Sequence, residues 1–167
     1  MKKFQILFLL VAINFISSCT NKSGSNLFDT AKKLAKQKKY AEAITNYNNI
    51  IKKFPESKFA PEALFEMAKM YQGQIIKNIT PQESLKKAVN YYKEIYSKYP
   101  DSPKAESSIF MAAFILANEL QDIEAARKTY NLYIKKYPQG ELVKDAKIEL
   151  QNLGKSPEEV LREKLNP

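Results

Sequence analysis

The sequence predicts an all-α protein, a solenoid of about three and a half helical hairpins, and three observations lead to this prediction. A motif that ends in proline occurs three times, as "YAEAITNYNNIIKKFPES", "LKKAVNYYKEIYSKYPDS" and "IEAARKTYNLYIKKYPQG". Within each copy, small, aromatic and apolar residues recur at the three- and four-residue steps of one helix face. A second apolar pattern follows each proline, so each unit is expected to contain two helices.

Residues 1–18 have the composition of a bacterial signal peptide. A positive start, Met1-Lys2-Lys3, precedes the apolar run "FQILFLLVAINFIS". This run is shorter than the roughly 20 apolar residues that a membrane-spanning helix needs. The following Ile16-Ser17-Ser18-Cys19 resembles the lipobox of bacterial lipoproteins. That resemblance implies cleavage before Cys19, a diacylglycerol on its thiol and acylation, for example with palmitate, of the new amine.

The alternative for Cys19 is a free or buried thiol near a cleavage site, and as the chain's only cysteine it has no disulfide partner within the chain. Two or three acyl chains would form a stable membrane anchor. Thr20 stands where an aspartate retains many lipoproteins in the inner membrane, so the resemblance implies the outer membrane, facing the periplasm. Residues 19–25 are expected to form the lipidated N-terminus and a polar tether, and residues 26–167 the repeat domain.

The composition argues against most enzyme chemistry. Histidine is absent, glycine occurs four times, and the single cysteine is the expected lipidation site. These facts remove most nucleophile–base pairs, transition-metal sites and Gly-rich phosphate loops. We therefore expect no catalytic activity, cofactor or metal. The formal charge of +9 suits either a solvated basic surface or attraction to anionic lipids and acidic partners.

The second helix of each hairpin is predicted from its distance to the proline. Four sets of equivalent positions, at twelve, eight, four and one residues before the proline, are expected to face the core. They are Ala43, Ala88 and Ala126; Tyr47, Tyr92 and Tyr130; Ile51, Tyr96 and Ile134; and Phe54, Tyr99 and Tyr137. Each helix should end before its proline, because the residue that precedes a proline avoids the helical region.

The first helices and the helix starts follow from the residues after each proline. Ser57 and Ser102 are predicted to cap the next helix. The core face of that helix recurs in two copies: Leu64, Met67, Ala68 and Tyr71, and then Ile109, Ala112, Ala113 and Leu116. Thr80 to Glu83 predicts a capping box. The first helix of a fourth, partial hairpin should end near Gly154. Ser156 should then start a short charged helix that caps the solenoid.

These units resemble the tetratricopeptide repeat, a helical hairpin with large apolar, small, alanine, aromatic and proline residues at fixed steps. In the first unit six residues match this spacing: Leu27, Ala31, Leu34, Ala43, Tyr47 and Pro55. The resemblance extends over about residues 26–153, with the second unit stretched by "QGQIIKNITPQE". The "YPxS" ending with an alanine three residues later resembles bacterial envelope lipoproteins, among them the BamD family of outer-membrane protein assembly and the repeat domain of the CpoB family.

The resemblance also implies a groove lined by the first helices. Six residues occupy its positions: Phe28, Lys32, Phe65, Lys69, Phe110 and Phe114. Phenylalanine holds the leading position in all three repeats, where chaperone-binding relatives grip a carboxylate with lysine and asparagine. An apolar or extended peptide is then the expected partner. Alternatively, these rings pack against neighbouring helices, and the interaction surface is the basic face around Lys52, Lys53, Lys135 and Lys136.

The resemblance and the lipobox together imply a lipid-anchored protein–protein interaction scaffold at the periplasmic face of the outer membrane. Envelope proteins are the expected partners, nucleic acid is not expected, and the implied process is outer-membrane protein assembly or cell-envelope maintenance. The alternative is an envelope enzyme or transport component that binds a small or polymeric ligand, such as peptidoglycan fragments. Such an enzyme would need polar groups that converge in a pocket.

Overall fold

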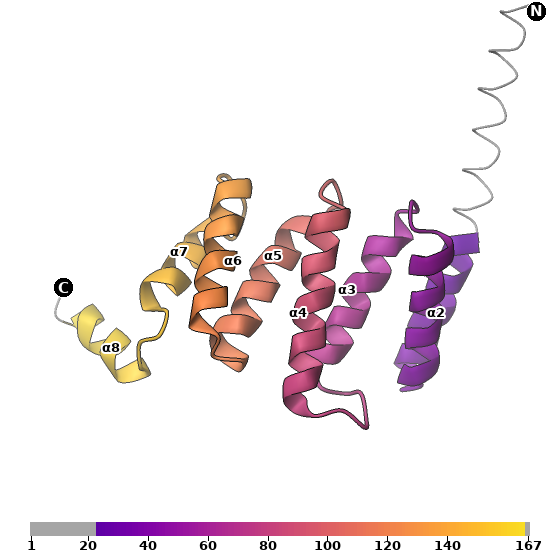
Figure 1. The fold of residues 1–167 in the computed structure, drawn as a ribbon, viewed down its shortest axis with the longest axis horizontal. Coiled ribbons are helices and arrows are strands. Elements are labelled where there is room, and N and C mark those ends of the chain that lie inside the picture. Colours follow the sequence, from indigo (N-terminus) through magenta and orange to yellow (C-terminus); the bar gives the residue numbers. More distant parts are fainter. Residues whose placement is uncertain (1–22, 166–167) are drawn as a thin grey trace, which may run out of the picture. The chain divides into compact units, whose positions relative to one another are not determined.

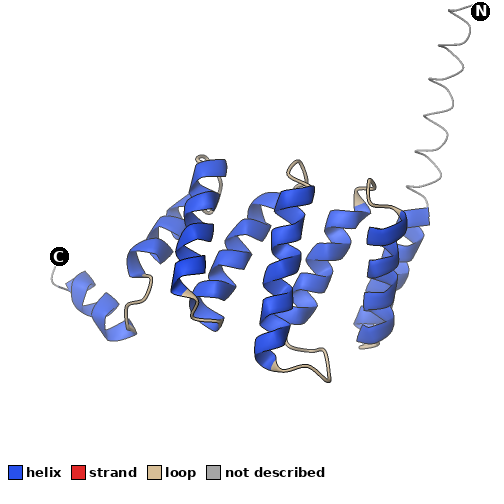
Figure 2. Ribbon diagram, viewed as in Figure 1, coloured by secondary structure: helices blue, strands red, loops and turns tan. Residues whose placement is uncertain are grey.

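A computed structural model describes residues 23–165, and this part of the chain contains helices and turns but no strand (Figures 1 and 2). Residues 23–36 are helical. The elements that follow are α2 (Tyr40–Lys53), α3 (Phe59–Gln72), α4 (Pro81–Lys98), α5 (Ala105–Phe114), the π-helical turn η1 (Ile115–Glu119), α6 (Ile123–Lys136), α7 (Val143–Asn152) and α8 (Pro157–Leu165). The predicted all-α class of repeated helical hairpins is confirmed. The expected signal peptide and Cys19 lie outside the described residues.

The chain forms two compact units, and the boundary falls inside α3, between Met67 and Ala68. In the N-terminal unit, Phe28 of the first helical segment packs against Tyr47 of α2 and Phe59 of α3, with ring centroids 5.7 and 5.6 Å apart. Residues 23–25, expected in the tether, are helical. Gly24 is buried, and a Cβ atom there would lie 3.4 Å from the Phe59 ring.

In the C-terminal unit, each helix packs against the next one along the chain: α4 against α5, α5 against α6, and α6 against α7. The turn η1 continues α5 and packs against α4 and α6. The core of this unit consists of side chains from these facing helices, among them Leu85, Ala88, Tyr92, Ile95, Ile109, Ala112, Ala113, Ala126, Tyr130, Tyr133 and Ala146. In the described part of the chain, no helix is long and apolar enough to cross a membrane.

Most of the predicted core register is confirmed. The three alanines twelve residues before a proline are fully buried, and the three tyrosines eight before it are at most 1 % exposed. The eight predicted core residues of the first helices are also buried: Leu64, Met67, Ala68 and Tyr71, and Ile109, Ala112, Ala113 and Leu116. Small residues at Ala43, Ala88 and Ala126 therefore lie where a larger side chain would push the packed helices apart.

Two of the four predicted sets of core positions are not fully buried. Phe54, Tyr99 and Tyr137, directly before the prolines, are half-buried. Ile51, Tyr96 and Ile134 are only half-buried. The residue before each of them is fully buried instead: Ile50, Ile95 and Tyr133. At about 100° per residue, Ile50 points within roughly 20° of Ala43, whereas Ile51 points about 80° away from it. The three-residue step from the tyrosine therefore stays on the core face, and the four-residue step leaves it.

The prolines end the second helices as predicted. The helices α2, α4 and α6 end at Lys53, Lys98 and Lys136. The next residue, directly before the proline, has φ −135° at Phe54, −128° at Tyr99 and −125° at Tyr137. These backbone conformations lie outside the helical region, as expected for a residue that precedes proline.

The first helices end differently, each with a residue of positive φ. These residues are Lys38 (φ 61°), Gln74 (53°), Gln121 (54°) and Gly154 (85°). At Lys38 and Gln74 the next N–H donates to a carbonyl five residues back, Lys39 to Leu34 and Ile75 to Met70. This pattern is the Schellman motif, which usually has glycine at the left-handed position. Only the last of the four positions carries glycine, and it follows the end of α7 at Asn152 as predicted.

The predicted helix starts are confirmed at Thr80 but not at Ser57. Thr80 Oγ1 accepts from the Glu83 N–H (3.2 Å), and the Thr80 N–H donates to Glu83 Oε2 (3.0 Å), which completes the capping box. Ser102 Oγ accepts from the Lys104 N–H at 3.2 Å, but Lys104 is the N-cap of α5 and the helix has no side-chain cap, so the predicted Ser102 cap is not confirmed either. Ser57 is buried, and its Oγ has no hydrogen-bond partner among the described residues. Its side chain packs near Gly24 instead of capping a helix.

Candidate functional site

The structure separates the six predicted groove residues into two groups by unit. Phe28, Lys32 and Phe65 belong to the N-terminal unit, and Lys69, Phe110 and Phe114 to the C-terminal unit. All four phenylalanines are half-buried, and both lysines are exposed. The rings therefore keep some surface for a partner while they also pack inside their own unit.

Phe28 is held by aromatic neighbours and by a lysine. Besides its contacts with Tyr47 and Phe59, its ring lies 5.7 Å from Lys32 Nζ. The lysine stands one turn further along the same helix, so its ammonium group reaches back over the ring. Phe28 and Lys32, predicted as neighbouring groove positions, thus form one surface feature, a half-buried ring with a cation beside it.

Phe110 joins the core tyrosines of α6. Its ring meets Tyr130 and Tyr133 edge-on, with centroid separations of 5.7 and 5.9 Å. Both tyrosines are fully buried. Such edge contacts stabilise a folded protein by about 0.5–1.5 kcal/mol beyond burial. Phe110 therefore has a packing role within its unit, which was the alternative to a purely partner-binding role. Phe114, one turn later, is half-buried at the end of α5.

A glutamine links three elements of the C-terminal unit next to the π-helical turn. The Tyr92 hydroxyl of α4 donates to Gln72 Oε1 at 3.2 Å, and Gln72 Nε2 donates to Glu119 Oε1 at 3.2 Å. Glu119 belongs to η1, whose wider backbone turn is shown by the Leu120 N–H bonding to the Ile115 carbonyl. Neither this link nor the π-helical turn has a sequence pattern that would have revealed it.

The buried tyrosines show no sign of acid–base function. Burial raises the pKa of Tyr47 and of Tyr130 well above the ordinary value, and the nearby Glu66 and Glu149 carboxylates raise each further. A phenol with a raised pKa stays neutral at physiological pH. Among the described residues, no group of three or more Asp, Glu, Cys or His side chains could hold a metal ion.

A cleft of about 890 Å³ lies near the C-terminus. Its walls come from η1, the start of α6, the end of α7 and α8. Amide side chains of Asn118, Gln121 and Asn152 line it together with apolar Ile123, Leu153 and Val160. Such a lining could hydrogen-bond and pack against a peptide or sugar chain.

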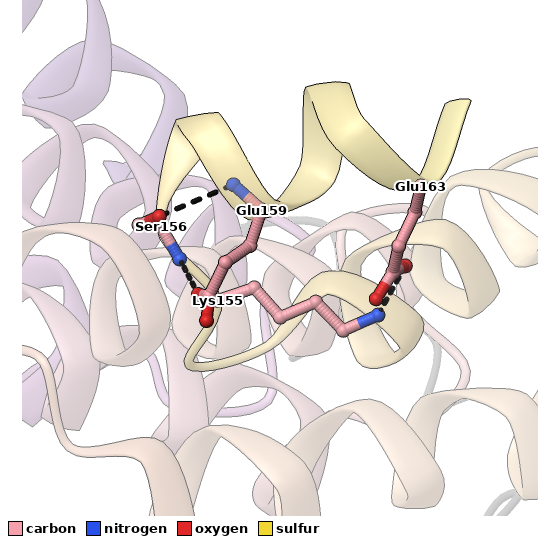
Figure 3. Close-up of polar contacts among 4 residues, drawn as sticks. All are labelled: Lys155, Ser156, Glu159 and Glu163. Atoms are coloured by element: carbon pink, nitrogen blue, oxygen red, sulfur yellow. Dashed lines mark hydrogen bonds and ion pairs between the residues drawn. The ribbon is translucent and has the colours of Figure 1, made fainter. Parts of the chain in front are cut away.

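The final helix α8 begins as predicted. Ser156 Oγ accepts from the Glu159 N–H (3.2 Å), the Ser156 N–H donates to Glu159 Oε2 (2.7 Å), and Lys155 Nζ pairs with Glu163 Oε2 at 2.6 Å (Figure 3). Helix α8 exposes more apolar surface than a polar solenoid cap would. Leu161 and Leu165 are 58 % and 70 % exposed.

The basic residues named as the other possible surface lie at helix ends. Lys52 and Lys53 end α2, Lys135 and Lys136 end α6, and all four are exposed. Lys136 Nζ lies 5.6 Å from the Tyr96 ring. Cations in the last turn also interact favourably with the helix dipole, so their position has a structural reason as well.

The repeated pair of antiparallel helices, with a small residue and a tyrosine at the contact and a proline at its end, defines a helical-repeat protein of the interaction-scaffold class. The chain belongs to the tetratricopeptide repeat family, whose model matches residues 26–57, 62–102 and 107–140, more than half of its length. No curated protein matches the chain. Tetratricopeptide repeats are typically non-enzymatic and bind other proteins or peptides, so the chain is a protein-binding scaffold.

Proposed function

We propose that the protein is a lipid-anchored scaffold that holds envelope proteins or extended peptides at the periplasmic face of the outer membrane. The observation that supports the location is the sequence Ile16-Ser17-Ser18-Cys19 after a short apolar run. The scaffold role rests on the tetratricopeptide repeats. The resemblance to the BamD and CpoB families suggests outer-membrane protein assembly or cell-envelope maintenance as the process.

The anchor is tested by changing Cys19 to Ala in the full chain. Metabolic labelling with radioactive palmitate should label the wild-type protein and not the variant, because the thiol is the acceptor of the lipid. The variant should also accumulate as an uncleaved precursor. A variant that is processed normally and still sediments with outer membranes would rule out the lipoprotein assignment.

For partner binding we propose Phe114 as the clearest test position in the C-terminal unit. It is half-buried, and truncating an aromatic anchor at an interface commonly costs about 2 kcal/mol of binding free energy. Phe110→Ala is less informative, since its ring packs against Tyr130 and Tyr133, and loss of packing would itself lower stability. Phe28, Lys32, Phe65 and Lys69 are the corresponding candidates in the earlier repeats.

The experiment is an affinity pull-down from solubilised envelopes with wild type, Phe114→Ala and the control Asn131→Ala, an exposed residue of α6. We expect Phe114→Ala to stay folded by circular dichroism at the assay temperature and to lose the partners that wild type and Asn131→Ala retain. If Phe114→Ala retains them all, the binding surface lies elsewhere. The exposed lysines at the ends of α2 and α6 are then the next residues to change.

The second candidate function, binding of a peptidoglycan fragment by an envelope enzyme or transport component, is favoured by the amide-lined cleft of about 890 Å³. Asn152→Ala with Gln121→Ala would remove two of its hydrogen-bonding side chains. Isothermal titration with soluble peptidoglycan fragments should show binding to wild type that the double variant lacks. No heat of binding with the wild-type chain would eliminate this candidate.

A further inference from the structure

The loop between α3 and α4 differs from the equivalent turns of the other hairpins. It spans residues 73–80, whereas the corresponding turns cover only residues 37–39 and 120–122. In Figure 1 this loop and the first turns of α4 extend past the nearby ends of α5 and α6. The additional residues therefore form a projection at one end of the C-terminal unit.

The projecting loop presents apolar surface. Its sequence is "GQIIKNIT", and Ile75 is 39 % exposed, one of four exposed large hydrophobic residues in the described chain. Ile76 and Ile79 are half-buried. The other three exposed residues, Ile148, Leu161 and Leu165, belong to helices α7 and α8, so Ile75 is the one at a loop position.

The base of the loop is fixed by hydrogen bonds. Ser84 Oγ donates to the Tyr71 carbonyl at 2.6 Å, a buried contact that joins the end of α3 to the first turn of α4. The Thr80–Glu83 capping box fixes the start of α4. Hydrogen bonds from Thr80 hold the pKa of the Glu83 carboxyl below its usual range. The loop is thus presented from a defined base.

Three lysines lie in this loop and in the first half of α4. Lys77 in the loop and Lys86 and Lys87 on α4 are all exposed. Both α4 lysines line one shallow depression of about 360 Å³ with Asn78 and Ile79. The Glu83 carboxylate at the same place accepts hydrogen bonds from the Thr80 N–H and hydroxyl and stays ionised. Three lysines against this one carboxylate still leave an excess of positive charge.

Lys87 Nζ lies 5.3 Å from the Tyr71 ring and is engaged there. We propose that this loop docks on an anionic phospholipid surface, with Ile75 at the acyl boundary and Lys77 and Lys86 on the phosphates. An exposed isoleucine with exposed lysines in the same loop and on the helix that follows matches the chemistry of a headgroup layer, which offers negative charge above an apolar interior. An acidic protein would satisfy the lysines but not the exposed isoleucine. The inference rests on the proposed lipid anchor in one respect: a tethered chain keeps the loop within reach of the bilayer.

The test uses tryptophan fluorescence, because the natural chain contains no tryptophan. Ile75→Trp in the full chain places a single reporter in the loop. Gln139→Trp is the control, since Gln139 is also exposed and lies in the turn between α6 and α7, at the opposite end of the hairpins (Figure 1). Both proteins are reconstituted with vesicles of phosphatidylcholine alone or mixed with phosphatidylglycerol. Circular dichroism melting verifies the fold, and Ile76→Trp supplies a second reporter in the same loop.

We expect the emission of the Ile75→Trp protein to shift to the blue and to be quenched by brominated lipid in the phosphatidylglycerol vesicles only. The emission of the Gln139→Trp protein should not change. Lys77→Gln with Lys86→Gln should lower the equilibrium constant for loop contact about 30-fold, since each lysine near an anionic surface contributes about 1 kcal/mol. Unquenched loop reporters in a chain that floats with the vesicles overturn the docking proposal and leave the anchor standing. A chain that does not float overturns both.

Two further outcomes test whether the loop docks on lipid. Quenching of the Ile75→Trp reporter in a chain that also carries Cys19→Ala would support loop docking independently of the anchor. Loop reporters that stay unquenched, together with protein partners lost by Lys77→Gln/Lys86→Gln in a pull-down, would overturn the proposal in favour of an acidic protein at this patch.

Discussion

The Tyr133 hydroxyl of α6 donates a 2.7 Å hydrogen bond to Glu106 Oε1 of α5. The same hydroxyl accepts from the Leu142 N–H at 3.1 Å, and the same carboxylate oxygen accepts from the Glu141 N–H at 3.1 Å. One tyrosine and one carboxylate thus connect two helices to the turn that precedes α7. The turn is held by side chains whose own helices are packed together.

Removing this hydroxyl should destabilise the protein. We expect Tyr133→Phe to lower the free energy of unfolding by about 1.5–3 kcal/mol, because the bond involves a charged acceptor and the Leu142 N–H also loses its partner. Tyr130→Phe is the matched control one turn earlier. The Tyr130 hydroxyl is buried with no hydrogen-bond partner among the described residues, so its removal should be neutral or stabilising. Urea unfolding measures both, and equal losses would contradict this assignment.

Gly140 should not tolerate a side chain. A Cβ atom there would overlap Glu106 Oε1 and lie 2.7 Å from the Tyr133 hydroxyl. We expect Gly140→Ala to lower the free energy of unfolding by about 1–3 kcal/mol, since the carboxylate must give up its bonds to make room. At Gly73 the nearest atom to a Cβ is the Lys69 carbonyl oxygen at 3.4 Å. Gly73→Ala should therefore change stability little, and thermal melting of the two variants tests the contrast.

Lys38 should be replaceable by glycine with a gain in stability. Its φ of 61° is unfavourable for a side chain with a Cβ atom and favourable for glycine. We expect Lys38→Gly to raise the free energy of unfolding by about 0.5–1 kcal/mol. Gln37→Gly, one residue earlier and inside the same turn, should not stabilise. A Lys38→Gly protein less stable than wild type in urea would show that the lysine makes a compensating contact.

Ala88 should not accept a larger residue. It is fully buried in α4, and α4 packs against α5. Ala88→Leu is expected to lower the free energy of unfolding by about 1–3 kcal/mol through overpacking. Asn90→Leu, two residues along at an exposed position, controls for the change of residue type. An unchanged melting temperature for Ala88→Leu would contradict the core register.

Stability should fall at alkaline pH. Burial, and then the bond to Glu106, raise the pKa of Tyr133 to about 12, and burial raises that of Tyr91 to about 12. Because the folded pKa lies above the unfolded value of about 10, this stabilisation is complete below pH about 10 and is lost as pH rises toward 12. Urea midpoints measured from pH 8 upward should fall less in Tyr133→Phe than in wild type. Parallel curves would contradict the shift at Tyr133.

The three prolines, the alanine–tyrosine spacing and the Thr80 and Ser156 caps were enough to predict the helical hairpins and most of the core. These features act within a few residues, through the clash before proline, hydrogen bonds at a helix start and one face of a helical wheel. The exact residues of each second helix that face the core were harder to predict. Ile50 and Ile51 are both isoleucine, and only packing against the neighbouring helices shows which of them is buried.

The sequence by itself determined the repeat family, the ends of the second helices before the prolines and the net positive charge, because each depends on residue type and local spacing. Only the tertiary structure decided which distant residues meet. Phe110 packs on Tyr130 and Tyr133. Glu106 reaches Tyr133 and Glu141, and Gln72 joins Tyr92 to Glu119. These contacts join residues 20 to 47 positions apart. Their formation depends on how helices stack, and no local pattern encodes such a distance.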